Sequence, residues 1–174
     1  WGFFIQVQIV TVNRQNALNF LHVRLDSGGD FDTILFYEVV IDTNIFLGAC
    51  LGRGAANQVI AACLRGQFTP LMGAALLGEY EDVLGRDTLL MKSRLSSQEQ
   101  QTLLDIFLSK AEWVRVYFAW RPNLPDEGDN HLVELAVAGG AEFIVTRNLR
   151  DLQRMELRFP QLKVVSPENF LKEL

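Results

Sequence analysis

The sequence predicts an α/β fold in which a central, mostly parallel sheet is flanked by helices, in three layers. Strand-like apolar runs alternate with helical patterns at least four times between residues 37 and 174, which is typical of a parallel sheet with helices on its faces. The composition is that of a globular domain, with 49% apolar and 21% charged residues. A chain of 174 residues is also long enough to bury a core without disulfides or a structural metal.

Residues 1–34 differ from the rest of the chain, and we expect them to form an appendage or an edge element ahead of a domain over residues 35–174. The run FFIQVQIVTV alternates like a strand. The run NRQNALNFLHVRL is compatible with a short helix or with a second strand, and DSGGDFD is typical of a turn or linker.

The first half of the larger domain reads as two strands, each followed by a helix. YEVVID is a short apolar run that ends in Asp42 and suits a buried parallel strand. A helix is expected over residues 55–65, because its apolar spacing is helical and Gly66 stops it. FTPLMG suits a short strand whose ladder pairing is limited by Pro70, and the next helix is expected over residues 74–84.

The second half continues the alternation. Ser96, Ser97, Gln98 and Glu99 form a capping sequence for a helix that runs to about residue 111. The next elements expected are a strand WVRVYF and a helix over residues 129–138 that ends at Gly139-Gly140. A strand EFIVT follows, with a short helical turn behind it. The chain then continues with a strand KVV and a last helix PENFLKEL, which has Pro167 in its first turn.

The charge balance limits the function classes. A net charge of −5 and a pI near 5.0 disfavour a protein that binds nucleic acid through a basic face. Two explanations remain open: the partner is not nucleic acid, or the acidic excess lies in a site that metal ions neutralise. We favour the second because of where the acids lie in the sequence.

The cysteines and the hydropathy pattern indicate the compartment. Cys50 and Cys63 lie in apolar, helix-like runs without a CxxC or Cys/His metal pattern, so we expect buried free thiols, no zinc site and a reducing cytoplasmic location. No run reaches the ~18 apolar residues of a membrane helix. The apolar start, residues 1–12, lacks the basic flank of a signal peptide, so no membrane association is expected.

Asp42 is the first candidate site residue, because it stands where a strong strand ends. The carboxyl ends of parallel strands form the ligand-binding edge of such a sheet. The alternative is structural, in which Asp42 or Thr43 caps the following helix. In the functional interpretation, Thr43 and Asn44 orient the Asp42 carboxylate by hydrogen bonds.

Glu79 is the second candidate, in the middle of the helix AALLGEYEDVLG. It shares a helix face with the apolar residues Ala75, Leu76 and Val83. A carboxylate on a core-facing side needs a partner, and a metal ion is one such partner. The alternative is a half-exposed surface glutamate.

Two further acid groups follow in the sequence. Asp126, Glu127 and Asp129 lie within four residues before an apolar helix, where they repel one another unless they are solvated or bind a cation. The alternative for Asp129 is a helix N-cap. Asp151 follows the second strand terminus, in FIVTRNLRDL, where Thr146 and Asn148 add a hydroxyl and an amide.

Together these acids predict a divalent-cation site. Mg²⁺ prefers oxygen ligands and usually takes one or two carboxylates with waters and phosphate oxygens, so several acids at one sheet edge suit one or two Mg²⁺ or Mn²⁺ ions. Such ions activate water and stabilise charge on a phosphate leaving group. The only histidines are His22 and His131, which leaves no good Ser-His-Asp or Cys-His candidate, and His131 is interpreted as a surface or cap residue. The motifs GxxxxGKS/T and GxGxxG are absent.

Four segments, in order, resemble the PIN-domain family. VVIDTNIFLGACL is similar to its opening strand with Asp-Thr-Asn, and LLGEYEDVL to the helix that carries its glutamate. PDEGDNHLVELAVAGGAEFIVTRNLRDL resembles the third and fourth motifs, and KVVSPENFLKEL the usual ending. The resemblance covers about residues 37–174, and is strongest to bacterial toxins of toxin–antitoxin pairs.

The resemblance implies a PIN domain over residues 35–174 that acts as a metal-dependent ribonuclease, with Mg²⁺ or Mn²⁺. It implies that Asp42, Glu79 and Asp129 are the catalytic metal-binding acids, with Asp151 as a fourth or supporting acid and Asp126 as an auxiliary ligand. Asn148 stands where many members carry Asp, a departure that bears on a second metal and on full activity. The family also implies an antitoxin protein as partner and a homodimer.

Substrate contacts are a separate prediction. Arg147 and Arg150, followed by Arg154 and Arg158, recur at a spacing of three to four residues, so they can share one helix face beside Asp151. A phosphate-positioning stripe and a solvated helix face both remain open. The tryptophans Trp113 and Trp120 are expected to pack in the core rather than to stack on bases.

Two other functions remain as alternatives. A haloacid-dehalogenase-like phosphatase also begins with Asp at a strand end, but it needs a second Asp two residues later, where this chain has Asn44. A catalytically weak PIN-like protein-binding module is the other alternative, and Asn148 supports it. Failure to bind Mn²⁺ would favour the binding module.

Overall fold

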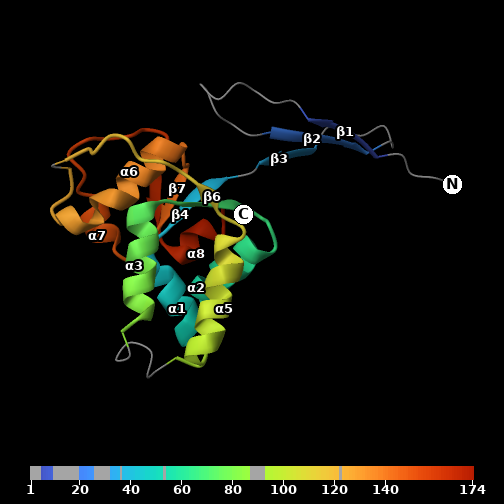
Figure 1. Cartoon of the computed structure of the whole chain (residues 1–174). Helices are drawn as coiled ribbons and strands as arrows, with labels where there is room; N and C mark the ends of the chain where they lie inside the picture. The colour runs from blue at the N-terminus through green and yellow to red at the C-terminus, as the bar shows by residue number, and fades with distance from the viewer. Residues whose placement is uncertain are drawn as a thin grey trace. The chain divides into compact units, whose positions relative to one another are not determined.

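The structure is a computed structural model that describes residues 5–9, 20–25, 32–35, 37–52, 54–86, 93–121 and 123–174. The chain divides into two compact units, Trp1–Tyr37 and Glu38–Leu174 (Figure 1). In the first unit, strands β1 (Ile5–Ile9), β2 (Phe20–Leu25) and β3 (Asp32–Leu35) pair antiparallel in the order β1-β2-β3. Residues 20–25 of the second predicted segment therefore form a strand, whereas residues 13–19 and most of DSGGDFD lie outside the described residues. That residues 1–34 act as an appendage stays a prediction.

The second unit is built on a five-stranded sheet in which every neighbouring pair is parallel, in the order β6-β5-β4-β7-β8. Its strands are β4 (Glu38–Ile41), β5 (Thr69–Met72), β6 (Glu112–Trp113), β7 (Phe143–Val145) and β8 (Lys163–Val165). The predicted α/β class is confirmed. The chain builds outward from β4 through β5 to β6, and then returns to β7 on the other side of β4. The strand order thus reverses between β4 and β7, and ligands bind at the carboxyl ends of strands at such a reversal.

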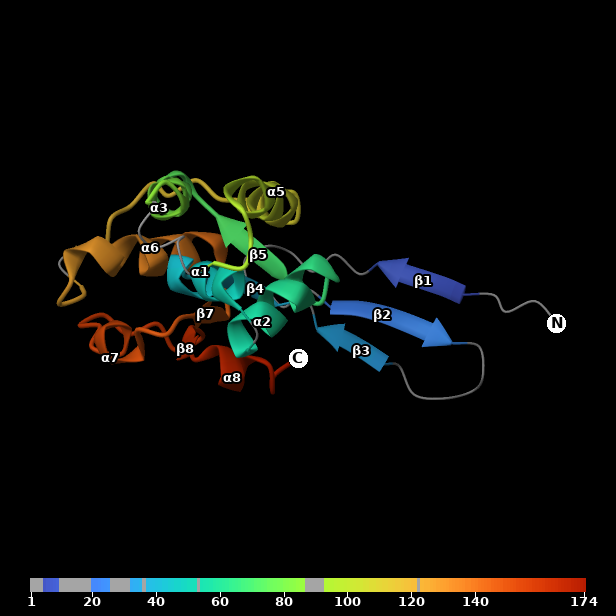
Figure 2. The same cartoon turned by 90° about the horizontal axis from the view of Figure 1, so that it is seen from below.

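Helices cover both faces of this sheet. Figures 1 and 2 show α1 (Thr43–Leu51) and α2 (Ala55–Leu64) on one face and α6 (Asn130–Gly139) on the opposite face. The other helical elements are α3 (Ala74–Leu84), α5 (Ser97–Leu108), a 3₁₀ turn η1 (Glu127–Asp129), α7 (Leu149–Leu152) and α8 (Pro167–Phe170). Among the described residues no single helix is long and apolar enough to cross a membrane, although α1 and α2, bent by 104°, meet the length and composition criteria together.

The two central strands, β4 and β7, lie in the core. Helices cover both faces of a parallel strand, so the sequence of such a strand is a continuous apolar run. Val39, Val40 and Ile41 of β4 are buried, as is every residue of β7. Pro70 does lie in an internal strand, and only two residue pairs join β5 to β4, against three between β4 and β7. These short ladders place the ends of β4 and β7 side by side.

An aromatic cluster fixes α3 beside the end of β4. Phe46, Tyr80 and Phe107, from α1, α3 and α5, have ring centroids 5.2–5.9 Å apart and are all buried. The Tyr80 hydroxyl donates a hydrogen bond of 3.0 Å to the carbonyl oxygen of Ile41, the last residue of β4. Buried tyrosines usually need such a partner. The bond ties the helix that carries Glu79 to the strand that ends at Asp42.

Several predicted boundaries hold, and others need correction. The helix 74–84 and the strand 163–165 occupy their predicted residues, and Ser96 with Glu99 forms the predicted capping box. The helix after this box ends at Leu108, and the last helix ends at Phe170, both earlier than predicted.

The predicted strand 113–118 is wrong beyond its first residue. Its neighbour β5 ends at Met72, opposite Trp113, and Gly73 already begins the turn into α3. The last bond of this ladder runs from the Val114 amide to the Met72 carbonyl oxygen, at 2.8 Å. The segment after Val114 therefore has strand-forming residues but no neighbouring strand to pair with.

Candidate active site

Asp42 lies at the reversal point, directly after β4, and is 6% exposed. Its Oδ1 accepts hydrogen bonds from the Asn44 amide at 3.1 Å and from the Thr43 hydroxyl at 3.2 Å. Its Oδ2 accepts from Asn44 Nδ2 at 2.7 Å and from the Thr146 hydroxyl at 2.6 Å. The bond from the Asn44 amide makes Asp42 the N-cap of α1. The structural interpretation is therefore confirmed, because Asp42 caps a helix. Its carboxylate also lies at the sheet edge, as the functional interpretation requires, and that interpretation stays a prediction.

The loop after β7 is joined to the same carboxylate. Thr146 is fully buried, and its hydroxyl also accepts from Asn44 Nδ2 at 3.2 Å and from the Asn148 amide at 2.9 Å. The Arg147 amide donates to Asn44 Oδ1 at 3.1 Å. Asn44 and Thr146 therefore connect α1, β4 and the loop behind β7 into one network around Asp42.

The side chain of Glu79, on α3, reaches the network around Asp42 through Thr43. Its Oε1 accepts from the Thr43 hydroxyl at 2.5 Å, and Oε2 lies 2.9 Å from His131 Nε2. This second contact is at ion-pair distance, although Nε2 makes no hydrogen bond of good geometry. The contact with His131 is the main reason that the pKa of Glu79 is lowered. The Glu79 side chain is 37% exposed, which agrees with the half-exposed alternative, but it is also paired with Thr43 and His131.

His131 was missed by the sequence reasoning, which treated it as a surface or cap residue. Its Nδ1 lies 2.7 Å from the Gly128 carbonyl oxygen, so both ring nitrogens face acceptors. Burial works to lower the pKa of His131, but the contacts with Glu79 and Gly128 and the charge of Asp129 raise it overall. One signal was available: this histidine follows the densest acid group by two residues.

Asp129 joins the cluster from the turn before α6. It stands at the N-cap position of α6, yet its side chain makes no capping hydrogen bond, so the capping alternative is wrong. Its Oδ2 accepts instead from Asn148 Nδ2 at 3.0 Å. Asp126 is the residue that caps, because its Oδ1 accepts from the Gly128 amide at 2.9 Å, and Asp126 is exposed.

The charges of three acids act on one another. Burial raises the pKa of Asp42, and the charge of Glu79 adds to this rise, against hydrogen bonds from Thr146, Asn44 and Thr43. Burial likewise raises the pKa of Asp129, followed by the charges of Asp42, Asp126 and Glu79. Carboxylates raise one another's pKa in this way when they share a site. Asp42, Glu79 and Asp129, from three separate elements, thus form one negatively charged cluster, which we call the acid cluster.

Asp151 lies elsewhere in α7, half-buried. Within the described part of the chain, its side chain makes no hydrogen bond or ion pair with the acid cluster. Arg147 and Arg150 are exposed nearby. The predicted arginine face is wrong, since α7 ends at Leu152 and leaves Arg154 and Arg158 outside any helix.

The early end of α7 has a physical reason. The chain after it is held by Asn123, whose carbonyl oxygen accepts from the Glu156 amide at 3.0 Å and whose Oδ1 accepts from the Leu157 amide at 2.8 Å. Asn123 is 2% exposed, so the acceptor of both bonds is held in a fixed, buried position. They replace the helical bonds that a longer α7 would have formed.

The donors suit a hard divalent cation in chemistry and in charge, because they are carboxylate oxygens whose repulsion a cation would relieve. The described residues contain no group of three or more His, Cys, Asp or Glu side chains already placed to hold a metal ion. Each acid is instead turned toward a protein donor: Asp42 toward Thr146, Glu79 toward Thr43 and His131, and Asp129 toward Asn148.

Comparisons with known proteins address the family. The family model described as "PIN domain" matches residues 38–150, more than half of the chain. No curated protein matches. Among solved structures, the chain is similar to "Crystal structure of VapBC2 from Rickettsia felis bound to a DNA fragment from their promoter", with 19% sequence identity and a TM-score of 0.46, over 74% of this chain and 98% of that chain. The family match includes Asp42, Glu79 and Asp129, and the chain therefore belongs to the PIN-domain family, whose members are generally nucleases.

Proposed function

We propose that this protein is a metal-dependent ribonuclease in which Asp42, Glu79 and Asp129 bind Mg²⁺ or Mn²⁺. The observation that carries the proposal is the acid cluster itself. Three carboxylates, from the end of β4, from α3 and from the turn before α6, lie close enough at the strand-order reversal for their charges to act on one another, and two of them have a raised pKa. Such perturbed acids at the ligand edge of a sheet indicate a functional site.

A bound divalent ion supplies a water of lowered pKa and stabilises charge on the scissile phosphate. The chain's own residues keep the acids in place for it. Thr43 contacts both Asp42 and Glu79 through its hydroxyl, so it sets the distance between the first two acids. Asn148 holds Asp129 by one oxygen, at 3.0 Å. The exposed Arg147 and Arg150 are our candidates for contacts with the RNA backbone.

A phosphatase mechanism through a phospho-aspartate has less support. The second Asp that it needs is replaced by Asn44, and Asn44 uses its side chain to hold Asp42 and the Arg147 amide. A catalytically weak binding module has one observation in its favour, since Asn148 occupies an oxygen of Asp129 where many family members carry another acid.

The sequence resemblance also supports a biological role. We propose that the protein is the toxin of a toxin–antitoxin pair, acts in the cytoplasm, is held inactive by an antitoxin protein and forms a homodimer. The unpaired, buried Cys50 and Cys63 suit a reducing compartment.

The test is cleavage of a labelled RNA by the purified chain in Mg²⁺ or Mn²⁺, with EDTA and with Asp42→Asn as controls. We expect cleavage that needs the metal and disappears in the variant. No cleavage by the wild-type chain, together with no metal binding in calorimetry, would overturn the proposal in favour of a binding module.

A further inference from the structure

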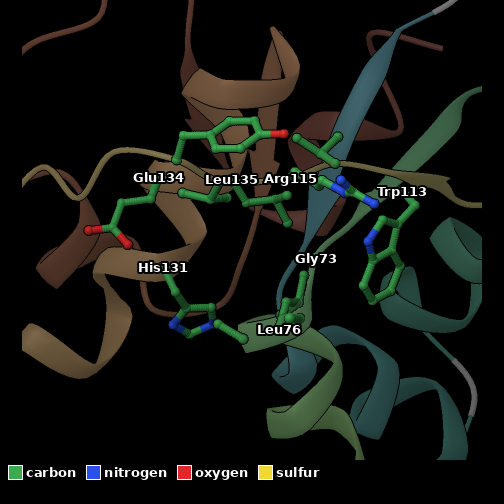
Figure 3. A pocket seen from close by; sticks show the side chains of 12 residues that line it. Gly73, Leu76, Trp113, Arg115, His131, Glu134 and Leu135 are labelled. Atoms are coloured by element: carbon green, nitrogen blue, oxygen red, sulfur yellow. The ribbon is translucent and has the colours of Figure 1, made fainter.

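A pocket of about 390 Å³ opens beside the acid cluster. It is lined by residues 73–76 at the start of α3, by residues 113–117 and by His131, Glu134 and Leu135 of α6. Figure 3 shows Trp113 and Arg115 at one end and His131 and Glu134 at the other. This volume lies in the range of pockets that hold small ligands, about 300–1,000 Å³.

One wall of the pocket is residues 113–117, the first part of a segment 113–121 that we call the strap. The strap is anchored at its start by the bond from the Val114 amide to Met72. At its end, the buried Glu134 accepts from the Trp120 amide at 3.1 Å and from Arg121 Nε at 2.9 Å. The strap is thus fixed at both ends, and the residues between them face the pocket or the solvent.

Gly73 lets the strap pass close to α3. A Cβ at Gly73 would lie 3.3 Å from the Val114 carbonyl oxygen and 3.1 Å from Leu135 Cδ1. Gly73 is also the N-cap of α3, where it provides no side-chain capping bond.

The strap exposes aromatic side chains into this space. Trp113 is 53% exposed and Tyr117 is 76% exposed, so the expectation that Trp113 packs in the core is wrong. Trp120 is 39% exposed and packs edge-on against Phe159, with ring centroids 5.9 Å apart. The wall therefore combines two exposed aromatic rings with the guanidinium of Arg115. Aromatic rings beside arginines form stacking platforms for the bases of single strands.

The pocket is continuous with the acid cluster through one side chain. His131 lines the pocket and lies 2.9 Å from Glu79, two residues after Asp129. A nucleotide whose phosphate lies at the acids therefore has a place for an adjacent base on the other side of His131. Exposed apolar strap residues alone would also suit a protein partner, but the Arg115 charge and the link to the acids favour a nucleic acid.

We propose that this pocket binds one nucleobase of the single-stranded RNA next to the cleaved phosphate, with Trp113 and Tyr117 as stacking residues and Arg115 as a polar contact. The inference rests on the proposed ribonuclease function and deepens it, because it assigns the residues that set which nucleotide is placed at the acids.

The first test measures binding without catalysis. A fluorescein-labelled single-stranded oligoribonucleotide with cleavage-resistant linkages is titrated with the chain in Mg²⁺, and anisotropy reports the Kd. The Trp113→Ala/Tyr117→Ala double variant loses the stacking contacts with the one bound base. We therefore expect it to bind the oligonucleotide roughly 5- to 150-fold more weakly than the wild type. Phe118→Ala is the matched control, since Phe118 is 76% exposed on the same strap but does not line the pocket. The single variant Trp113→Phe keeps an aromatic ring, so it should retain most of the wild-type affinity.

The second test locates the base. A series of the same oligonucleotide with one abasic position at a time should show one position at which wild-type affinity falls, and the double variant should be insensitive at that position. A flat series for the wild type, or a double variant that binds as tightly as Phe118→Ala, would overturn the inference. Circular dichroism and thermal unfolding of each variant check that its fold is retained.

Cleavage separates this inference from the proposed function. If the wild-type chain cleaves RNA, and the double variant cleaves the same sites with the same KM, the pocket inference falls and the ribonuclease proposal stands. If the wild-type chain neither binds nor cleaves RNA, both fall. Unchanged RNA affinity with lost self-association in sedimentation would instead assign the strap to a protein contact, against the inference.

Discussion

The Thr146 hydroxyl donates a hydrogen bond of 2.6 Å to Asp42 Oδ2 and thereby joins the ends of β7 and β4. These residues are 104 positions apart in the sequence, and both are buried. Burial raises the pKa of Asp42, and this bond is the strongest effect that opposes the rise, because it stabilises the charged carboxylate. The acid cluster thus depends on a neutral side chain from a second strand.

Thr146→Val tests that dependence. Valine keeps the shape of threonine but cannot donate, so Asp42 loses one partner and Asn148 and Asn44 lose an acceptor. We expect the free energy of unfolding to fall by about 1–3 kcal/mol in EDTA, and Mn²⁺ affinity in calorimetry to fall as well. Thr102→Val is the control, because Thr102 bonds only to a carbonyl of its own helix. Wild-type Mn²⁺ affinity in Thr146→Val would argue against a role of this bond in the site.

Asn148→Asp tests the departure from the family pattern. The new carboxylate would lie about where Asn148 Nδ2 now donates to Asp129, at 3.0 Å. Like charges at this distance repel, so the variant should be less stable than the wild type in EDTA. Added Mn²⁺ should stabilise the variant more than the wild type, because ligand binding to the folded state adds stability. Thermal unfolding with and without Mn²⁺ measures both effects.

The opposite result for Asn148→Asp is equally informative. A variant that is more stable than the wild type in EDTA and gains nothing from Mn²⁺ would show that residue 148 does not share a charged site with Asp129. It would favour the interpretation of Asn148 as a purely structural residue.

His131→Gln tests the ion pair with Glu79 through the pH dependence of stability. The pKa of Glu79 is lowered in the folded state, so its contribution is present above the usual value of 4.5 and is lost as the pH falls through the folded pKa. The pKa of His131 is raised, so its contribution is present below 6.5 and is lost as the pH rises through the folded pKa.

The pair should therefore stabilise the metal-free protein most between about pH 4.5 and 6.5. Because the Glu79 side chain is 37% exposed, we expect a contribution of at most about 1 kcal/mol. Urea unfolding in EDTA across pH 4–8 measures it, and the difference between wild type and His131→Gln should peak in that window. A difference that does not vary with pH would mean that the contact carries no net charge interaction.

The sheet and three of the acids could be predicted from the sequence because their signals are local. Asp42 ends an apolar strand, and the carboxyl ends of parallel strands meet at one edge whatever the loops do. The apolar neighbours of Glu79 predicted an inner helix face, but of Ala75, Leu76 and Val83 only Leu76 is buried, and Glu79 itself is half-buried. The dense acids before α6 marked a charged turn, although only the structure separates Asp129, which joins the cluster, from Asp126, which caps η1.

The remaining parts depend on contacts between distant segments. The ion pair of His131 with Glu79 requires α3 and α6 to lie side by side. No local sequence pattern predicts which two helices pack against each other. WVRVYF has strong strand propensity, but pairing also needs a neighbour, and β5 ends at Met72. The arginine spacing suited a longer helix, which the bonds from Asn123 to the following segment prevent.

Mn²⁺ titration calorimetry on single acid variants tests most directly whether Asp42, Glu79 and Asp129 form one metal site. We predict that wild type and the control Asp105→Asn, an exposed acid of α5, bind Mn²⁺ alike, and that Asp42→Asn, Glu79→Gln and Asp129→Asn each lose binding while they still unfold cooperatively. Wild-type Mn²⁺ affinity in any of those three variants would contradict a shared site.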